Sequence, residues 1–426
     1  MRSRIFFILL VTLAIIGRLS AQSLDPDIMD SLAKHVPGSG FPVINSKIGT
    51  LIISPYVSLR YLNQMATDDS YVDDFNRVKS VDPRNDFQMH KIIVYFRGWL
   101  FDPKLRWVLN AWCSNANMGQ TAQAFFIGSL QYDFKKWLGF GGGTQGIPGA
   151  RSLLYSWPNW LRMDCRPMAE EFFRPSYTFG IWIQGELAPG LNYKSMLANN
   201  LSELGIDAGQ LDSGFDTWGS SLWWTTNDFG KLGPYGDFEH HCKPATILTV
   251  GFTRSNETKQ SQPGVDDPEN TQIRLSDGTG IFALDAFVDS SQVTAAKYEM
   301  LSASGGIKYR GFSLDGEFFT RWISQIEYVG NTPPSSLFDN GFSVQASAMI
   351  IKKTLQLYGA GSYVNGQYGY PYEIIGGVNW YVLKNRILRF NGEVIFPHNS
   401  PVGYLAYPTA VGSNGHIFML NLEVNF

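Results

Sequence analysis

Apolar and polar residues alternate along most of the chain from residue 51 onward. The C-terminus shows this most clearly, because every second residue is apolar and the residues between them are mainly polar, the apolar set being Phe418, Leu420, Leu422, Val424 and Phe426. Successive side chains of a β-strand point to opposite faces. A period of two therefore predicts strands with one face suited to lipid and the other to water.

Sixteen segments show this alternation, separated by Gly, Asp, Asn and Pro. They are 54–65, 87–100, 105–115, 123–133, 136–146, 174–186, 191–200, 219–226, 245–255, 300–309, 311–323, 341–351, 354–364, 371–382, 385–396 and 416–426. A sheet in lipid satisfies its backbone only when it closes, so an even number of such segments predicts an all-β, antiparallel transmembrane β-barrel. We expect about 16 strands over residues 51–426, with short periplasmic turns and longer outer loops.

Two segments leave the strand number open. Segment 219–226 has the weakest alternation, and segment 281–288 is an uncounted rival, so 14 or 18 strands are alternatives. The longest interval between segments, 256–299, contains a Ser, Asn, Gln, Pro and Asp stretch typical of a solvated loop.

The N-terminus has the order of a secretory signal peptide. Arg2 and Arg4 precede an apolar run over residues 5–16, and small residues follow up to Ala21. The run is shorter than the ~20 residues that a helix needs to cross a membrane. We expect residues 1–21 to be removed and the chain to reach the bacterial cell outer membrane. Residues 22–50 then form a periplasmic leader with one helical cue at Asp25 and Pro26.

Composition excludes several classes of protein. Residues 22–426 contain no uninterrupted apolar stretch of about 18 residues, which argues against a helical inner-membrane protein. The net charge of -3 and the absence of a Lys/Arg-rich run argue against nucleic-acid binding. Of the three cysteines, Cys165 and Cys242 fall on expected loops, where a disulfide between them is possible.

We expect no cofactor, no metal and no catalysis. The cluster Asp237, Glu239, His240, His241 and Cys242 has ligand-type side chains, but it lacks the spacing of a zinc motif. The glycine-rich stretch 139–146 lacks a P-loop ending, and no G-x-S-x-G occurs.

Two alternatives from other classes stay open at this stage. An outer-membrane barrel enzyme could recruit His90 or His398, although the sequence pairs neither with a nucleophile. An adhesin-type binding barrel is suggested only by the long interval 256–299.

The sequence resembles the phosphate-selective porin O and P family of outer-membrane porins. The matching stretches follow the family's order over roughly residues 50–426 and are Arg97-Gly98-Trp99-Leu100-Phe101, Phe172-Phe173-Arg174-Pro175, Gly180-Ile181-Trp182-Ile183-Gln184-Gly185, Leu191-Asn192-Tyr193 with Asn199-Asn200, Gly305-Gly306-Ile307-Lys308-Tyr309, Asp339-Asn340-Gly341-Phe342-Ser343-Val344-Gln345-Ala346 and Gly376-Gly377-Val378-Asn379-Trp380-Tyr381. The resemblance implies a sixteen-stranded porin, often a homotrimer, with an inward-folded third loop and basic residues at the constriction. The chain departs from the family in having no dense ladder of arginines.

The best candidate for that third loop is 147–173. It carries Arg151, Arg162 and Arg166, and Arg174 lies at its exit, so we expect these four to form the constriction. Trp157, Pro158, Trp160 and Pro167 would help the loop fold over itself. Arg162, Arg166 and Arg174 would then bias the channel toward anions; the alternative is that they pair with Asp164, Glu170 and Glu171 and only pin the loop.

Charges on the polar face of the strands should line the lumen. The basic candidates are Arg60, Lys91, Arg97, Arg106, Lys194, Lys308, Arg321 and Arg389, and the acidic ones are Glu186, Asp315, Glu317, Glu373, Glu393 and Glu423. This near balance in a water-filled lumen favours passive diffusion of small hydrophilic solutes or ions, with an anion or phosphate preference implied by the resemblance. The partners expected are outer-membrane lipid and, through the strand ending at Phe426, the barrel-assembly machinery.

Overall fold

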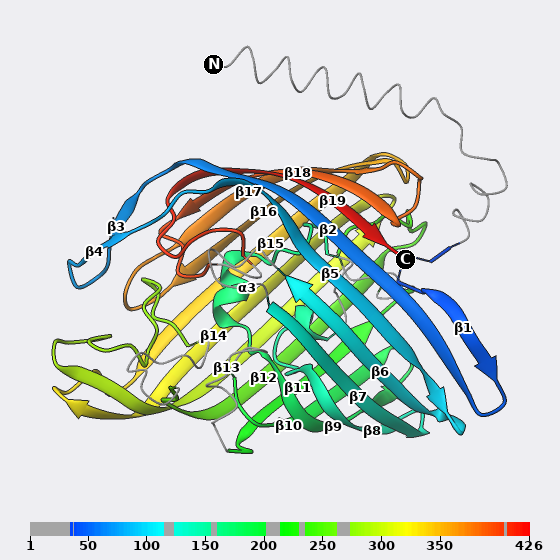
Figure 1. Ribbon diagram of the computed structural model, residues 1–426, viewed down its shortest axis with the longest axis horizontal. Coiled ribbons are helices and arrows are strands. Elements are labelled where there is room, and N and C mark those ends of the chain that lie inside the picture. The colour runs from blue at the N-terminus through cyan, green and yellow to red at the C-terminus, as the bar shows by residue number, and fades with distance from the viewer. Residues whose placement is uncertain are drawn as a thin grey trace, which may run out of the picture.

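The chain folds into a closed antiparallel β-barrel (Figure 1). The computed structural model describes residues 35–36, 38–114, 123–154, 160–201, 214–229, 235–261, 273–403 and 407–426. Each wall strand pairs with the next along the chain, and the first wall strand pairs with the last, so sixteen strands close the sheet. The predicted fold class is confirmed, and segment 281–288 consists of turns.

The wall strands run in chain order around the barrel. They are β2 (Gly49–Thr67), β5 (Asn85–Leu100), β6 (Asp102–Ser114), β7 (Gln123–Lys135), β8 (Leu138–Gly146), β9 (Tyr177–Ala188), β10 (Leu191–Ala198), β11 (Thr217–Thr225), β12 (Ala245–Thr258), β13 (Ser291–Tyr309), β14 (Phe312–Gly330), β15 (Leu337–Ile351), β16 (Leu355–Asn365), β17 (Tyr372–Tyr381), β18 (Leu388–His398) and β19 (Gly415–Asn425). The weakest predicted segment, 219–226, is therefore a real strand, β11.

Alternation decides which face of each strand turns outward. Along β14, Leu314 and Phe318 are about half exposed, whereas Asp315 and Glu317 between them are buried. The apolar face covers the outside of the barrel, where lipid solvates it, and the charged face turns into the lumen. The described residues contain no helix that is both long and apolar enough to span a bilayer.

The two ends of the barrel differ in the length of their links. At one end, here called the inner end, most links are short and comprise 101, 136–137, 189–190, 310–311, 352–354 and 382–387. At the opposite, outer end the links include the intervals 68–84, 147–176, 199–216, 259–290 and 399–414. Short turns face the periplasm in barrels of this kind. The exception at the inner end is the link 226–244, here called the inner loop.

Three short strands lie outside the sixteen. β1 (Phe41–Ser46) pairs with the inner part of β2, beyond the point where β19 ends. β3 (Ser70–Val72) and β4 (Val78–Ser80) form a hairpin in the first outer link. The described end of the expected leader 22–50 is thus partly strand. Residues 1–34, with the expected signal peptide, Asp25 and Pro26, lie outside the described residues, so both expectations stay predictions.

The expected solvated loop over 256–299 is wrong at both ends. β12 continues to Thr258 and β13 begins at Ser291, and β13 and β14 each contain 19 residues. The first part of β13 carries Ser, Gln, Thr, Ala and Lys on its two faces. Where a strand extends beyond lipid, its outer face has no need to be apolar, so the alternation that identified the other strands is absent there.

Candidate pore constriction

The link between β8 and β9 enters the barrel, and residues 147–176 are here called the in-folded loop. It contains a 3-10 turn at Arg151–Leu153 and helix α3 (Met168–Phe173). The backbone N–H of Met168 donates to Glu373 on β17, and that of Ala169 donates to Ser362 on β16. These bonds attach α3 to the inside of the far wall. Trp157 and Pro158, expected to help this loop fold, lie outside the described residues.

Glycines let the start of the in-folded loop lie directly against the wall. A Cβ on Gly251 of β12 would lie 2.4 Å from the carbonyl oxygen of Gly149, and one on Gly219 of β11 would lie 2.3 Å from the Ile147 side chain. Such distances are far shorter than ordinary carbon contacts. The two wall glycines therefore provide the room in which the loop runs, a signal that sequence reasoning missed.

Arg151 fastens the first turn of the in-folded loop to β14. Its Nη2 lies 2.6 Å from Asp315 Oδ1, and its backbone N–H donates to Glu317 Oε1 at 3.1 Å. The guanidinium also lies over the rings of Phe229 and Tyr235 from the inner loop, at 5.3 and 4.6 Å from their centroids. Arg151 thus joins the two loops that enter the lumen from opposite ends.

Arg162 makes a bidentate ion pair with the wall. Its Nη2 lies 2.7 Å from Glu393 Oε1, and its Nε lies 2.9 Å from Glu393 Oε2 on β18. The remaining terminal nitrogen donates to the carbonyl oxygen of Arg166 at 2.8 Å. Both partners of the ion pair are almost completely buried. Paired, parallel N–H donors of this kind fix orientation as well as charge.

Arg166 and Arg174 are held by the acidic residues of their own loop. Arg174 pairs with Glu171 at 2.5 Å, and Arg166 lies 3.4 Å from Glu171 and 3.9 Å from Glu170. Burial raises the pKa of Glu171, but the two arginines outweigh it and hold the pKa below its ordinary value. Burial dominates at Glu170 and raises its pKa. These are the ion pairs that the pinning alternative expects for Arg166 and Arg174.

Asp164 connects the in-folded loop to β5 through two basic side chains. Its Oδ2 lies 2.5 Å from Lys91 Nζ and 2.7 Å from His90 Nε2. Although burial raises the pKa of Asp164, Lys91 and His90 hold it well below its ordinary value. Arg60 of β2 donates to the carbonyl oxygen of Met163 at 3.1 Å and so holds the same turn from the neighbouring strand.

The three cysteines are not bonded to one another. Cys165 is buried in the lumen, whereas Cys242 is exposed in the inner loop, so the disulfide considered from the sequence is absent. The Arg60 guanidinium lies 3.4 Å from the Cys165 sulfur. Burial raises the pKa of the Cys165 thiol, which keeps it protonated.

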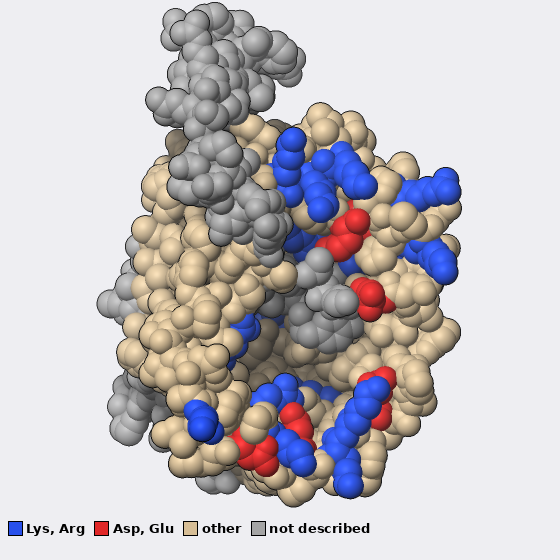
Figure 2. Space-filling model, turned by 90° about the vertical axis from the view of Figure 1, so that its right-hand side faces the viewer, with Lys and Arg blue, Asp and Glu red and all other residues tan. Residues whose placement is uncertain are grey.

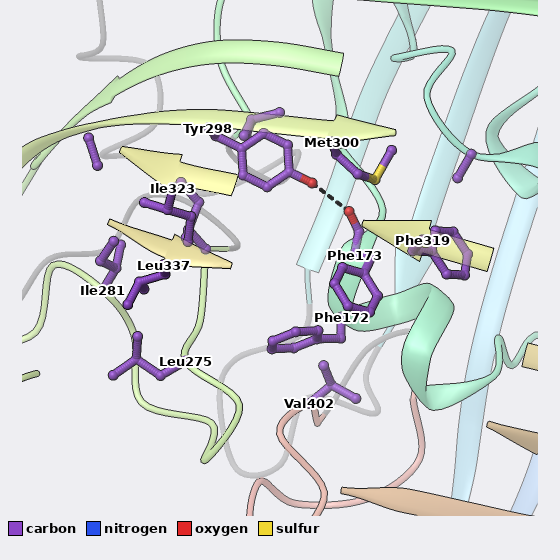
Figure 3. Close-up of a cluster of buried hydrophobic side chains, with 14 of the residues drawn as sticks. Phe172, Phe173, Leu275, Ile281, Tyr298, Met300, Phe319, Ile323, Leu337 and Val402 are labelled. Carbon is purple, nitrogen blue, oxygen red and sulfur yellow. Dashed lines mark hydrogen bonds between the residues drawn. The ribbon is translucent and has the colours of Figure 1, made fainter. Parts of the chain in front are cut away.

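An apolar cluster fills part of the lumen, which was expected from the sequence to be filled with water. Figure 3 shows Phe172 and Phe173 of α3 close to Tyr298 and Phe319 of the wall, with the Tyr298 hydroxyl donating to the Phe173 carbonyl oxygen at 2.6 Å. The Phe173 and Phe319 rings stack with centroids 5.4 Å apart. Other members come from the outer links, namely Leu275, Ile281, Phe282, Phe287 and Val402.

Most of the predicted lumen charges do lie inside the wall. Those that are buried are Arg60, Lys91, Lys194, Lys308, Arg321, Arg389, Asp315, Glu317, Glu373, Glu393 and Glu423. Six of these eleven form ion pairs with other described residues, as in Arg321 with Asp339 at 2.5 Å and Arg389 with Glu423 at 2.7 Å. The buried interior therefore carries charges of both signs, about half of them in ion pairs, rather than a ladder of one sign.

Three predicted lumen residues lie nearer the inner end. Arg97 is half-buried and donates to the carbonyl oxygen of Gly38. Arg106 is exposed and pairs with Asp133 at 2.5 Å, and Glu186 pairs with Lys136 at 2.9 Å. These three belong to the mouth of the barrel and not to the constriction.

The inner mouth is surrounded by basic side chains. Figure 2 faces this end and shows Lys and Arg around a hollow, with some Asp and Glu among them. Exposed basic residues of the inner links are Lys47, Lys136, Lys243, Arg310, Lys352, Lys353 and Lys384. The outer links instead expose carboxylates, at Asp68, Asp69, Asp74, Asp82, Asp216 and Asp289. The inner links expose one carboxylate, Asp228, so the exposed charges of the described links are mainly basic at the inner end and mainly acidic at the outer end.

The two histidines considered for an enzyme have structural contacts. His90 lies inside the wall against Asp164, and Nδ1 of His398 lies 2.9 Å from the Asn414 side chain at the outer end. Each imidazole is thereby oriented by a loop residue. The geometry gives no specific support to the enzyme alternative.

Solved structures share this fold, although no family model and no curated protein matches the sequence. The anion-selective porin from Comamonas acidovorans matches with a TM-score of 0.55 at 11% identity, covering 89% of this chain and 100% of that one. The outer-membrane-expressed OmpT of Vibrio cholerae matches with a TM-score of 0.52 at 10% identity, covering 90% and 99%. The outer membrane channel DcaP of Acinetobacter baumannii matches with a TM-score of 0.51 at 8% identity, covering 91% and 100%.

These likenesses define the class of fold. The chain has the architecture of the porin-like barrels of the bacterial outer membrane, so the predicted outer-membrane barrel is confirmed at the level of the fold. The resemblance to the phosphate-selective family in particular stays a prediction.

Proposed function

We propose that this protein is an outer-membrane porin through which small hydrophilic solutes or ions diffuse passively. The observation that carries the proposal is the closed barrel whose polar face turns inward and whose in-folded loop, between β8 and β9, crosses the lumen. Closure leaves the wall without free edges, and the charged inner face requires water or paired charges. In this proposal solutes pass beside the in-folded loop, which narrows the path.

An anion preference, within this proposal, comes from the inner mouth rather than from the loop arginines. Arg162, Arg166 and Arg174 are each buried against carboxylates, so little of their field reaches the lumen. The exposed basic residues around the inner mouth are solvated and face incoming ions. Phosphate is one anion that such a mouth would admit.

Other parts of the proposal concern export and assembly. Residues 1–21 direct export. The backbone N–H of Phe426 donates to Pro55 of β2 at 3.1 Å, so the last residue completes the seam that the assembly machinery must close. A homotrimer in outer-membrane lipid is also proposed, and one structural match is to a trimer form of Vibrio cholerae OmpT, with a TM-score of 0.51 at 10% identity.

Conductance in a planar lipid bilayer tests the proposed function. The purified barrel should insert and give discrete current steps, while the same protein unfolded by heat should give none. A correctly folded protein that never conducts would contradict the porin and favour an enzyme or a binding barrel. Lipid and peptide hydrolysis assays on the same preparation then separate those two.

A further inference from the structure

The inner loop is much longer than the other links at the inner end, and it turns into the barrel. Lys308 Nζ donates to the carbonyl oxygen of Phe229 at 3.0 Å, and the Gly311 backbone N–H donates to Asp237 Oδ2 at 2.7 Å. Phe238 packs edge-to-face against Tyr381 with ring centroids 4.8 Å apart. The described residues on both sides of this loop are therefore bonded to or packed against the barrel at the inner mouth.

Three potential metal ligands converge in the second half of this loop. One ligand atom from each of Asp237, Glu239 and His241 lies within 4.8 Å of the other two. The convergence follows from a turn, because His240 has a positive φ of 62° and its N–H donates to the Asp237 carbonyl oxygen at 3.3 Å. In an extended chain, every second residue shares a face but lies about 6.6 Å from the next.

Glu239 provides a second observation at the same place. Both of its carboxylate oxygens are inaccessible to solvent, and neither accepts a hydrogen bond from a described residue. Its one ion-pair contact, to Arg386 Nη2, is 3.7 Å long. Buried carboxylate oxygens normally have hydrogen-bond partners, because desolvation without them is costly. The carboxylate thus has unused capacity to accept a ligand, and it lies beside an imidazole.

We propose that Asp237, Glu239 and His241 bind a divalent transition-metal ion, with zinc as the best fit. One imidazole nitrogen and two carboxylate oxygens form a donor set that zinc accepts, at bonds of about 2.0–2.2 Å, with water in the fourth position. Asp237 Oδ1 and His241 Nδ1 are 2.5 Å apart and share a hydrogen bond. When Nδ1 binds the metal, an imidazolium releases the proton between the two atoms to solvent, whereas a neutral imidazole carries its proton on Nε2 instead. The two ligand atoms then separate by about 1 Å to reach tetrahedral spacing.

A metal ion here would tie three points of the inner loop together beside Gly311 and Arg386. This reverses the expectation from the sequence, where the spacing of the cluster argued against a metal. The proposal does not depend on conduction, because the inner loop occupies its place whether or not solutes pass.

Metal binding by the folded, chelator-treated protein tests the assignment. Zn2+ titrated calorimetrically should bind with one equivalent per chain, and Co2+ should give the visible absorption bands of tetrahedral coordination. Glu239→Gln and His241→Ala should each weaken binding at least tenfold. His240→Ala removes the neighbouring imidazole, which lies outside the three-residue set, and should change binding less than twofold.

Two results would overturn the proposal. One is wild-type protein without measurable Zn2+ binding, and the other is Zn2+ binding that survives in Glu239→Gln and His241→Ala but is lost in His240→Ala. Ca2+ or Mg2+ competing at equal concentration would likewise overturn it, since hard cations do not need the imidazole. Heat-modifiable gel migration confirms that each variant is folded, and Glu239→Gln removes no hydrogen bond, so it keeps the test valid if His241→Ala fails to fold.

Discussion

The arginines of the in-folded loop and the lysines of the inner mouth carry the same charge in opposite settings. Arg162 is fully buried and held by Glu393 in a bidentate ion pair. Lys352 and Lys353, in the short link between β15 and β16, are exposed. A buried, paired charge stabilises the position of a chain segment, whereas an exposed one contributes a field that ions encounter. Counting basic residues in the sequence cannot separate these two roles.

Removing one partner of the buried pair should have the largest effect. Arg162→Met leaves the Glu393 carboxylate buried without its cation, which typically costs about 3–5 kcal/mol. Unfolding of the detergent-solubilised protein in urea, followed by tryptophan fluorescence, measures the loss. The matched control is the double variant Arg162→Met/Glu393→Met, which should recover most of the stability. Equal losses in the single and double variants would show that the pair does not pin the loop.

Displacing the in-folded loop without changing any charge should have a smaller effect. Gly251→Ala places a Cβ against the Gly149 carbonyl oxygen, and overpacking of this kind costs about 1–3 kcal/mol. We also expect a smaller single-channel conductance in a planar bilayer, because the loop must move away from the wall and further into the lumen. Gly376→Ala is the control, since a Cβ there has no atom within 4 Å. If both variants behave alike, the close approach at Gly251 has no role in positioning the loop.

Changing the exposed charges should alter ion preference and leave stability unchanged. Lys352→Gln together with Lys353→Gln should lower the anion-to-cation permeability ratio about twofold, because screened surface charges contribute ~0.2–1 kcal/mol. The reversal potential across a salt gradient measures the ratio. Lys79→Gln is the matched control, since Lys79 lies at the outer end and pairs with Asp73 at 3.3 Å. An equal change of the permeability ratio in Lys79→Gln would show that the exposed lysines of the inner mouth have no special effect on ion preference.

Much of the wall could be predicted from the sequence because lipid imposes one rule on every strand. The alternation of Leu314 and Phe318 with Asp315 and Glu317 repeats what the bilayer and the lumen each require. Alternation no longer distinguishes the two faces of a strand where the lumen-facing residues are apolar as well. Phe318 faces outward and Phe319 faces the lumen. The sequence around Phe319 does not indicate that its ring stacks on Phe173 of the in-folded loop.

The contents of the lumen could not be predicted for a different reason. The arginines of loop 147–173 could be identified, but their roles depend on distant partners. Arg162 and Glu393 are 231 residues apart in the chain, and many other acidic residues were equally available as partners. The inner loop was missed as a structural element because its conformation depends on contacts of Asp237 with Gly311 and of Phe229 with Lys308, and both partners belong to another hairpin.

The short strand β1 bears on the order in which the barrel forms. The seam joins residues far apart in the chain, such as Tyr56 and Glu423, separated by 367 positions, and closing so long a segment costs about 5 kcal/mol in chain entropy. β1 and β2, by contrast, meet through the tight turn between Ser46 and Gly49 on the same edge of β2 that β19 later occupies. A local hairpin of this kind forms early, whereas the seam closes last. During that interval β1 covers the inner part of an edge that would otherwise be open to pairing with another chain.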